Sequence, residues 1–260
     1  PWVARDLDTD AADVALGGIW RPLMYRGRLS TYYAFAQLCA RCPLYLLSRK
    51  RLDDFSWPDL FDKIVLVSDG APSPYMIFRA VLEADDVDLR RIRLLQDLLA
   101  PEATELFQAG LGDFYLTGPP TSTQLIADGV AYSAVSIAEK WGPLPWSVYY
   151  ARPEYLKDPR QPATRFTRAI QRALRWVLTN EPEAAPGVMK THFPTSDPKV
   201  IAEAVRGCRD TGVWIEDVGV DLESLLRWQQ VTTRSALIDG PIAYDEIVDS
   251  GPAQAASKEG

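Results

Sequence analysis

Short apolar runs alternate with longer amphipathic stretches along most of the chain. The clearest run, residues 64–67, is wholly apolar and predicts a buried strand, whereas 162–179 carries apolar residues at helical spacing and predicts a long amphipathic helix. Because strands and helices alternate, we expect an α/β fold with parallel-rich sheets and helices on both faces. The other expected strands are 13–16, 31–37, 44–48, 92–95, 114–117, 131–137 and 146–150, and the other expected helices are 4–12, 19–26, 75–84, 101–109, 121–128, 197–210 and 222–232.

Two linker-like segments suggest a division of the chain into two lobes. Trp57-Pro58 lies in a polar stretch, and 142–145 reads Gly-Pro-Leu-Pro. Between these two segments the predicted strands and helices alternate, as expected of a separate α/β lobe. We therefore expect a discontinuous first lobe (1–54 and 146–260), an inserted second lobe (55–145) and two hinge crossovers. The tail after Asp249 is expected to be disordered.

Composition and charge narrow the function classes. The chain has 260 residues, of which 47% are hydrophobic and 24% charged, as in ordinary water-soluble domains. No apolar run approaches the ~18–20 residues that a membrane-spanning helix needs. The net charge of −7 argues against nucleic acid as a partner, because phosphate binding favours a basic face. Four arginines recur at helical spacing and are interpreted as a solvated helix face: Arg165, Arg168, Arg172 and Arg175.

Three cysteines and one histidine offer few candidates for redox or metal chemistry. Cys39 and Cys42 form either a local disulfide or two plain buried thiols, and Cys208 is left over. A zinc site would need these cysteines and His192 together, but the four residues are too scattered along the chain for us to expect one. We therefore expect no metal and no cofactor.

Three strand ends carry the same local signature. At 16–18, 68–74 and 117–121 an apolar strand is followed by glycine and then by a helix. In open α/β sheets the ligand lies beyond the carboxyl ends of strands, where glycine lets it approach the backbone and helix N-termini favour anionic or polar groups. Each glycine alone is better explained by a tight turn. The three together predict a ligand-binding cleft.

These segments also resemble a known family. Residues 13–18, 63–74 and 118–120 are similar to the solute-binding proteins for nitrate, sulfonate, taurine and thiamine-pyrimidine precursors, with Gly-Ala-Pro-Ser at 70–73 the strongest part. The resemblance covers about 11–175 and implies the two-lobed type II periplasmic-binding-protein fold. It also implies a monomer that binds a small molecule between its lobes and delivers it to the permease subunits of an ABC importer.

The chain departs from that family at its start. The family has a strand, a helix and a second strand before the segment that matches 13–18, and we expect this N-terminal portion to be missing here. No basic start followed by an apolar stretch marks an export signal. The resemblance implies a periplasmic or cell-surface lipoprotein, and a complete chain would instead be cytoplasmic.

Aromatic residues near the strand ends indicate the kind of ligand. Family members sandwich flat ligands between rings, and Trp20, two residues after Gly18, is the preferred candidate, although core packing is the better explanation for most of these rings. Asp69 either binds an amino group of a pyrimidine or caps the following helix. The expected ligand-binding residues are Gly17, Gly18, Trp20, Tyr32, Asp69, Gly70, Ala71, Pro72, Ser73, Gly118, Pro119 and Trp146.

The favoured function is therefore binding of a pyrimidine-like or other heteroaromatic solute, without catalysis. Arg21 and Arg41 keep a sulfonate- or nitrate-type anion open as an alternative. An enzyme on the same fold, such as a pyrimidine synthase, would need histidine and a cysteine-rich segment, but this chain has one histidine, His192, and no run of cysteines. No Gly-x-Ser-x-Gly elbow is present. A sensor that has lost its ligand is the remaining alternative.

Overall fold

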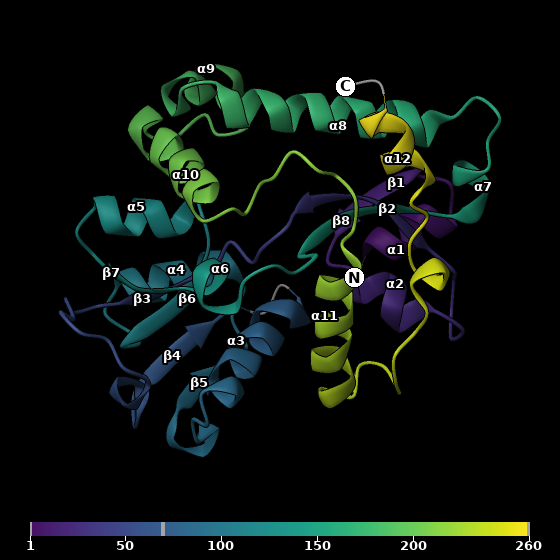
Figure 1. The fold of residues 1–260 in the computed structure, drawn as a ribbon. Helices are drawn as coiled ribbons and strands as arrows, with labels where there is room; N and C mark the ends of the chain where they lie inside the picture. The colour runs from purple at the N-terminus through teal and green to yellow at the C-terminus, as the bar shows by residue number, and fades with distance from the viewer. Residues whose placement is uncertain (1, 69–70, 259–260) are drawn as a thin grey trace. The chain divides into compact units, whose positions relative to one another are not determined.

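The computed structural model describes residues 2–68 and 71–258, with side chains from Arg5 onward. The chain forms two compact units, each built from separate stretches. Unit 1 contains the chain up to Arg41, Pro143–Asn180 and the chain from Gly212 onward, and unit 2 contains Cys42–Gly142 and Glu181–Thr211. Both units combine a sheet with flanking helices, which confirms the α/β class (Figure 1).

Unit 1 is built on a three-stranded sheet of order β1-β8-β2. Both strand pairs are antiparallel, with Leu16 opposite Tyr149 and Cys39 opposite Ser147. The expectation of a parallel-rich sheet is wrong for this unit. The chain leaves unit 1 after β2 and returns through β8 as its neighbour, so the two strands run in opposite directions. The strands are β1 (Val14–Gly17), β2 (Tyr33–Cys39) and β8 (Ser147–Ala151).

The helices of unit 1 bury their apolar sides against this sheet. Helices α8 and α12 pack against each other and against β2, where Phe35, Leu174 and Ala253 belong to one buried cluster (Figure 1). The ring of Phe35 contacts the edge of Phe166 on α8 at a centroid distance of 6.0 Å. The helices are α1 (Trp2–Asp8), α2 (Trp20–Tyr25), α7 (Pro153–Leu156), α8 (Pro162–Thr179), α11 (Leu222–Arg234), the 3-10 turn η4 (Tyr244–Glu246) and α12 (Gly251–Ser257).

The C-terminal segment is ordered, which contradicts the expectation of a disordered tail. Residues 251–257 form α12, and its Pro252, Ala253 and Ala256 are buried against α8 and β2. Small residues and proline looked like linker composition in the sequence. Their small side chains instead let the helix approach its neighbours closely, and proline is tolerated in a first helical turn.

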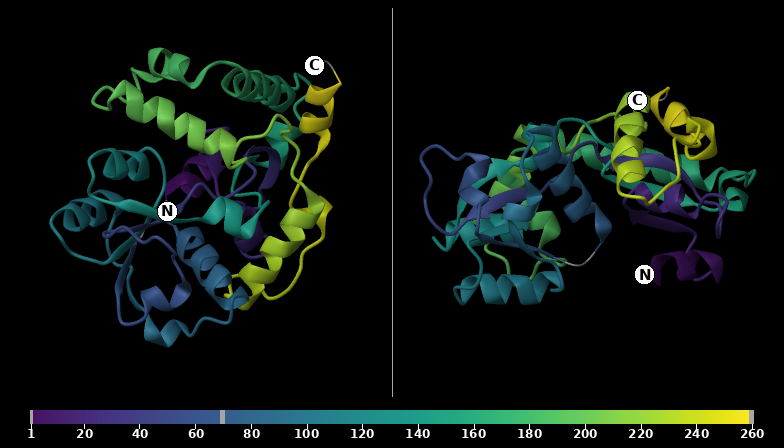
Figure 2. Two further views of the ribbon diagram at one scale, coloured as in Figure 1. Left: turned by 60° about the vertical axis from the view of Figure 1, so that its left-hand side comes forward. Right: turned by 90° about the horizontal axis from the view of Figure 1, so that it is seen from below.

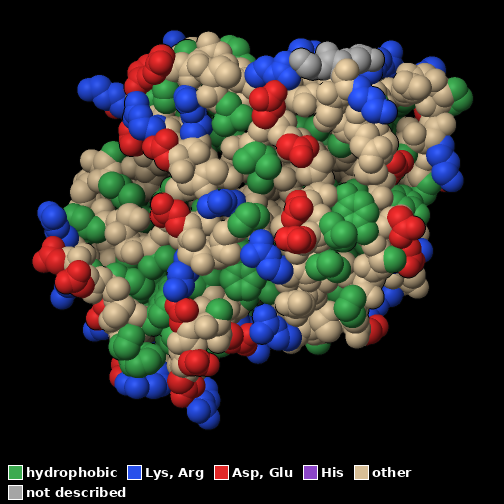
Figure 3. All heavy atoms as spheres, in the orientation of Figure 1, with side chains coloured by type: hydrophobic (Ala, Val, Ile, Leu, Met, Phe, Trp, Pro, Cys, Tyr) green, Lys and Arg blue, Asp and Glu red, His purple; other side chains and the backbone are tan. Residues whose placement is uncertain are grey.

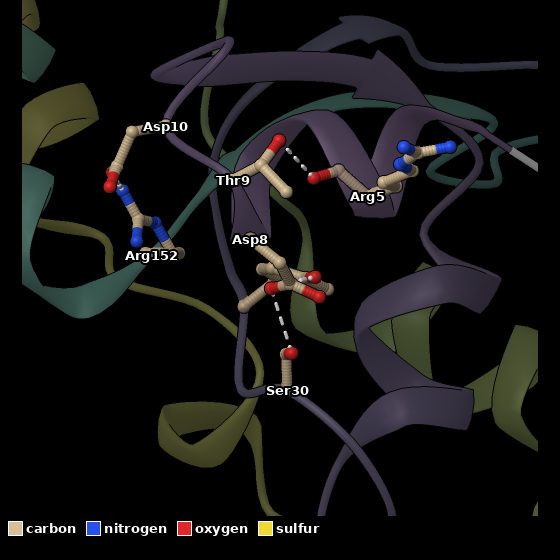
Figure 4. A network of polar contacts seen from close by, with 7 residues as sticks. Arg5, Asp8, Thr9, Asp10, Ser30 and Arg152 are labelled. Carbon is tan, nitrogen blue, oxygen red and sulfur yellow. Dashed lines mark hydrogen bonds and ion pairs between the residues drawn. The ribbon is translucent and has the colours of Figure 1, made fainter.

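The N-terminal helix is attached to unit 1 by polar contacts (Figure 4). The Asp8 carboxylate accepts hydrogen bonds from the Ser30 hydroxyl at 2.8 Å and the Tyr32 hydroxyl at 2.7 Å. Arg152, which follows β8, pairs with Asp10. The Thr9 hydroxyl donates to the Arg5 carbonyl at 2.8 Å and so closes the last turn of α1. These contacts anchor α1 beside the edge strand β1.

Unit 2 contains a five-stranded mixed sheet of order β5-β4-β6-β3-β7. Strands β5, β4 and β6 are parallel neighbours, and β3 is antiparallel to both β6 and β7. Because β3 pairs inside this sheet, the boundary expected at residue 54 differs from the unit boundary after Arg41. The strands are β3 (Tyr45–Ser48), β4 (Ile64–Val67), β5 (Arg93–Leu95), β6 (Phe114–Thr117) and β7 (Tyr132–Ser136).

One face of that sheet carries a closed apolar cluster. Leu47, Leu66, Phe107 and Tyr115 are fully buried in it, each with 0% of its surface exposed. Arg49 caps the C-terminal end of α4. Its guanidinium stacks over the Phe107 ring and donates a hydrogen bond to the Phe107 carbonyl at 2.6 Å. The helices on the insertion are η1 (Trp57–Leu60), α3 (Pro72–Ala84), η2 (Leu89–Arg91), α4 (Ala100–Gln108), α5 (Thr121–Ala127) and α6 (Ile137–Trp141).

A later stretch of the chain returns to unit 2. Residues 181–211 form three elements, and α10 packs along α9 and against α5 (Figures 1 and 2). The chain therefore passes between the units at four points, after residues 41, 142, 180 and 211, where two crossovers were expected. The helix pattern of α10 was visible in the sequence, but its partner was not. The three elements are η3 (Pro182–Ala184), α9 (Ala185–Met189) and α10 (Pro198–Asp210).

Acidic and basic side chains are interspersed on the face shown in Figure 3. On α8, Arg165 and Arg172 are exposed and Arg175 bonds Glu216 at 2.9 Å, as expected of a solvated helix face, whereas Arg168 is half-buried. Among the described residues, no helix combines the length and apolar character needed to cross a bilayer.

Candidate functional site

Two of the predicted strand ends lie side by side in unit 2. Strands β4 and β6 are parallel neighbours, with Val67 opposite Leu116. Ser68 and Thr117 therefore leave the sheet at the same edge, and helices α3 and α5 begin a few residues beyond them. This is the carboxyl edge of parallel strands, where ligands bind in open α/β sheets. The structure thus brings 71–73 and 117–119 to one edge.

The first of these segments starts its helix earlier than expected. Ala71 has extended backbone angles (φ −167°, ψ 156°), and α3 begins at Pro72, whose missing N–H costs nothing in a first turn. Ser73 is only 5% exposed, whereas Ala71 and Pro72 are half-buried. Asp69 and Gly70 lie outside the described residues, so the choice between a capping and a ligand role for Asp69 stays open.

The second segment is shaped by close packing. A side chain on Gly118 would come within 3.3 Å of both the Pro43 carbonyl oxygen and the Leu44 side chain, so only glycine fits comfortably. Its carbonyl accepts the Ser122 N–H at 3.0 Å and thereby begins α5. The Pro119–Pro120 peptide bond is cis. This packing explains the glycine by itself, and a ligand contact at Gly118 stays a prediction.

Unit 2 also has a mainly apolar cavity of about 470 Å³. Pro119 lies on its wall together with Ile126 of α5 and Val200 of α10. Tyr45 of β3 also lines the cavity, and burial raises the pKa of its hydroxyl. The volume is that of a small-molecule pocket, although few polar groups converge on it.

The third strand end lies in unit 1, where β1 stops at Gly17. A side chain on Gly17 would lie 3.4 Å from the Tyr150 hydroxyl, so the glycine leaves room for that ring on the neighbouring strand β8. The Gly18 carbonyl accepts the Arg21 N–H at 3.1 Å and starts the short helix α2. The contact with Tyr150 accounts for Gly17, and a ligand contact at Gly17 or Gly18 stays a prediction.

Trp20 and Arg21 occupy the first turn of α2. Trp20 is 9% exposed, and the guanidinium of Arg21 lies over its ring, 4.9 Å from the centroid. Arg21 also extends Nη1 to within 3.5 Å of the Tyr150 hydroxyl. The sequence identified Trp20 as a ligand candidate, and the structure adds a cation that lies on its ring.

Tyr32 lies in a cluster of tyrosines beneath this turn. Its ring is 5.6 Å from Tyr25 and 5.8 Å from Tyr150, measured between centroids, and only 1% of the residue is exposed. Burial raises the pKa of its hydroxyl to about 12, and the bond to Asp8 adds to that rise. The packing role of Tyr32 is therefore clear, and its ligand role stays a prediction.

Trp146 stands just before β8 and is half-buried. Its backbone N–H donates to the Leu144 carbonyl at 2.7 Å and the Cys39 carbonyl at 3.0 Å, which fixes the start of the strand. The predicted residues thus fall into two groups, one in each unit. Sequence reasoning missed Tyr150 as a partner of Arg21, because 129 positions separate them.

All three cysteines are buried and none forms a disulfide within the described residues, which resolves the alternatives for Cys39 and Cys42 in favour of buried thiols. Burial raises the pKa of the Cys39 thiol to about 11. At neutral pH that thiol is protonated and a poor nucleophile. His192 is exposed in the loop between α9 and α10, and its backbone N–H bonds the Met189 carbonyl at 2.9 Å.

Known proteins share this fold at low sequence identity. No family model matches the chain. A Bacillus subtilis protein named "Putative binding protein YtlA" is 23% identical over 254 residues, which cover 96% of this chain and 76% of that protein. The "putative sulfonate ABC transporter, periplasmic sulfonate-binding protein SsuA" from Methylobacillus flagellatus KT superposes with a TM-score of 0.73 at 16% identity, covering 99% of this chain and 78% of that one.

The desulfurization enzyme DszB has the same fold. A point mutant of that enzyme in complex with biphenyl-2-sulfinic acid gives a TM-score of 0.71 at 14% identity, covering 99% of this chain and 89% of that one. The chain therefore has the α/β fold of periplasmic solute-binding proteins, and that fold also occurs in an enzyme.

Proposed function

We propose that this protein is the solute-binding component of an ABC importer and that its solute is a small organic molecule. The observation that carries the proposal is the placement of β4 and β6 as parallel neighbours, which brings two strand ends to one edge in unit 2. The sharing of the fold with the sulfonate-binding protein SsuA supports it. The strand ends at 68 and 117 are proposed to supply ligand contacts.

The proposed solute has a flat, preferably heteroaromatic part. Trp20 is the ring that contacts it, since stacking on an aromatic face contributes about 0.5–1.5 kcal/mol beyond area burial. Ala71, Pro72 and Ser73 offer the start of α3 to its polar atoms. The ligand shifts the protein toward a closed form, and that form docks on the permease subunits outside the cytoplasmic membrane.

The test is calorimetric titration with pyrimidines, flavins, alkanesulfonates and nitrate. At least one compound is expected to bind with micromolar affinity, and Trp20→Ala should weaken that binding about tenfold or more, by the magnitude of a lost stacking contact and its buried area. Trp176→Ala is the matched control, because Trp176 is 37% exposed on α8 in the same unit. Failure of every compound to bind at millimolar concentration would refute the importer role.

An enzyme acting on a small sulfur compound is the second candidate, because DszB shares the fold. The buried Cys39 thiol, with its pKa raised to about 11, is unsuited to nucleophilic attack in this structure. Sulfite release from biphenyl-2-sulfinic acid is the discriminating assay. Turnover above the uncatalysed rate would favour the enzyme, and binding without turnover would favour the receptor.

A further inference from the structure

Arg21 differs from the neighbouring arginines of unit 1 in having no carboxylate partner among the described residues. Arg26 pairs with Glu246 at 2.5 Å and Arg28 with Asp239 at 2.6 Å. Arg21 is half-buried and forms no ion pair within the described part of the chain. A cation that has lost part of its hydration without gaining an opposite charge is energetically costly. The burial of Arg21 therefore calls for a functional explanation.

The guanidinium is held in place by two rings. It stacks on Trp20 at 4.9 Å, and its Nη1 reaches the Tyr150 hydroxyl at 3.5 Å. Tyr150 is fully buried and cannot shift easily, and Gly17 provides the space for its hydroxyl. The position of the charge is thus determined by packing, which is how proteins pre-organise a recognition group.

Most of the hydrogen-bonding capacity of Arg21 is unused. Arginine has five N–H donors, and the single hydrogen bond of its side chain within the described residues is the long one to Tyr150. The Tyr150 hydroxyl in turn donates its hydrogen to no acceptor in residues 5–68 and 71–258. Within the described residues, the cation thus has one distant acceptor and the phenol has none, and an anionic oxygen would satisfy the cation directly.

We propose that Arg21 binds the anionic head group of the solute, a sulfonate or a carboxylate. Trp20 and Tyr150 act here as positioning residues that orient the guanidinium, whose planar fork matches two oxygens of such a group. The inference rests on the proposed function, because it names the chemical class of the same solute. It places the negative end of the molecule at unit 1, beside Gly17 and Gly18.

The experiment compares three probes of matched shape: benzenesulfonate, benzoate and benzyl alcohol. Calorimetry on the full chain is expected to show that at least one anion binds more tightly than the alcohol. Arg21→Gln should weaken the anion about 10- to 100-fold, the range for a lost charge-assisted hydrogen bond, and leave the alcohol unchanged. Arg21→Lys should recover part of the loss, because it restores the charge without the bidentate geometry.

Two controls separate a specific site from a general charge effect. Arg172→Gln removes an exposed charge from α8 in the same unit and should leave all three affinities unchanged. Anion binding to the native protein should weaken as salt rises, and this dependence should diminish in Arg21→Gln. Circular dichroism verifies folding, and Arg21→Lys serves as the reporter if Arg21→Gln fails to fold.

The outcomes are distinct for the two proposals. Equal binding of anions by Arg21→Gln and the native protein, or binding of the alcohol alone, would overturn the role of Arg21 and leave the importer function intact. Absence of binding for all three probes at millimolar concentration would overturn the anion inference. The importer proposal would fall only if the wider solute panel also failed. The preferred anion, sulfonate or carboxylate, identifies the head group.

Discussion

The two units solve the same packing problem with different side chains. In unit 2 the parallel strands β4 and β6 are apolar or buried along almost their whole length, and the cluster around Leu66 and Phe107 excludes water. Unit 1 has an apolar cluster of its own around Phe35 and Leu174, but Tyr32 and Tyr150 also bring hydroxyl groups into its interior. Those hydroxyls contact Asp8 and Arg21.

This difference indicates how stability and recognition are distributed. The unit 2 cluster is mostly aliphatic and phenyl, with the Tyr115 hydroxyl bonded to the Ala100 carbonyl, and it is stabilised chiefly by burial of apolar area. A sheet that buries hydroxyls needs polar partners, because an unpaired buried donor or acceptor costs about 1–3 kcal/mol. We therefore expect unit 2 to be sensitive to loss of volume and unit 1 to be sensitive to loss of specific hydrogen bonds.

The largest effect is expected from Phe107→Ala in unit 2. Phe107 is fully buried against Tyr115 at a centroid distance of 5.6 Å, so truncation should lower the free energy of unfolding by about 3–5 kcal/mol. Leu106→Ala is the control on the same helix, because Leu106 is 37% exposed. Urea unfolding followed by circular dichroism measures both. Equal losses of unfolding free energy in the two variants would show that the apolar cluster of unit 2 does not exclude water.

Gly112→Ala should have the next largest effect. Gly112 has φ +81°, and a side chain there would meet the Leu66 side chain at 2.9 Å, so backbone strain and overpacking combine to about 2–4 kcal/mol. Gly129→Ala isolates the backbone contribution, because Gly129 has φ +69° with no atom within 4 Å of the added carbon. The contrast in thermal midpoint between the two variants measures packing alone. Identical midpoints would contradict tight packing around Leu66.

Tyr32→Phe tests the polar interior of unit 1 and should cost about 1–3 kcal/mol, since it removes a hydrogen bond to the charged Asp8 and keeps the ring. Tyr132→Phe is the exposed control in unit 2. The pKa of Tyr32 is raised to about 12 in the folded protein, above the unfolded value near 10, so its contribution is complete below pH 10 and is lost as pH rises toward 12.

Spectrophotometric titration in this pH range provides the measurement for Tyr32. One fewer tyrosine should ionise above about pH 11 in Tyr32→Phe than in the native protein. An unchanged high-pH phase would mean that another buried tyrosine accounts for it, and would remove the main polar distinction between the units.

Local structure was largely predictable from the sequence, because strands and helices depend on neighbouring residues. The strand 114–117 and the helix 162–179 have the predicted bounds. The pairings of β3 and α10 were not predictable, because their partners lie far away in the sequence. The helix at 251–257 was missed since composition alone does not reveal that α8 offers a surface for it.

For the candidate site, the sequence located the strand ends at 68 and 117, and the structure adds that β4 and β6 are parallel neighbours. The ligand contacts expected at these strand ends stay predictions. The sequence could not show that Gly118 packs against Pro43 or that Gly17 makes room for Tyr150. Arg21 drew attention only as a possible anion contact, and its missing carboxylate partner among the described residues became visible once its neighbours in space were known.

Unit 2 is built from two separate stretches of the polypeptide, so its parts are synthesised at different times. The ribosome completes the last sheet strand at Ser136, but α10 starts at Pro198. Until α10 emerges, the wall of the cavity that bears Ile126 has no second wall opposite it on the nascent polypeptide. Unit 2 can therefore complete this cavity only late in translation, when residues 198–210 have been added.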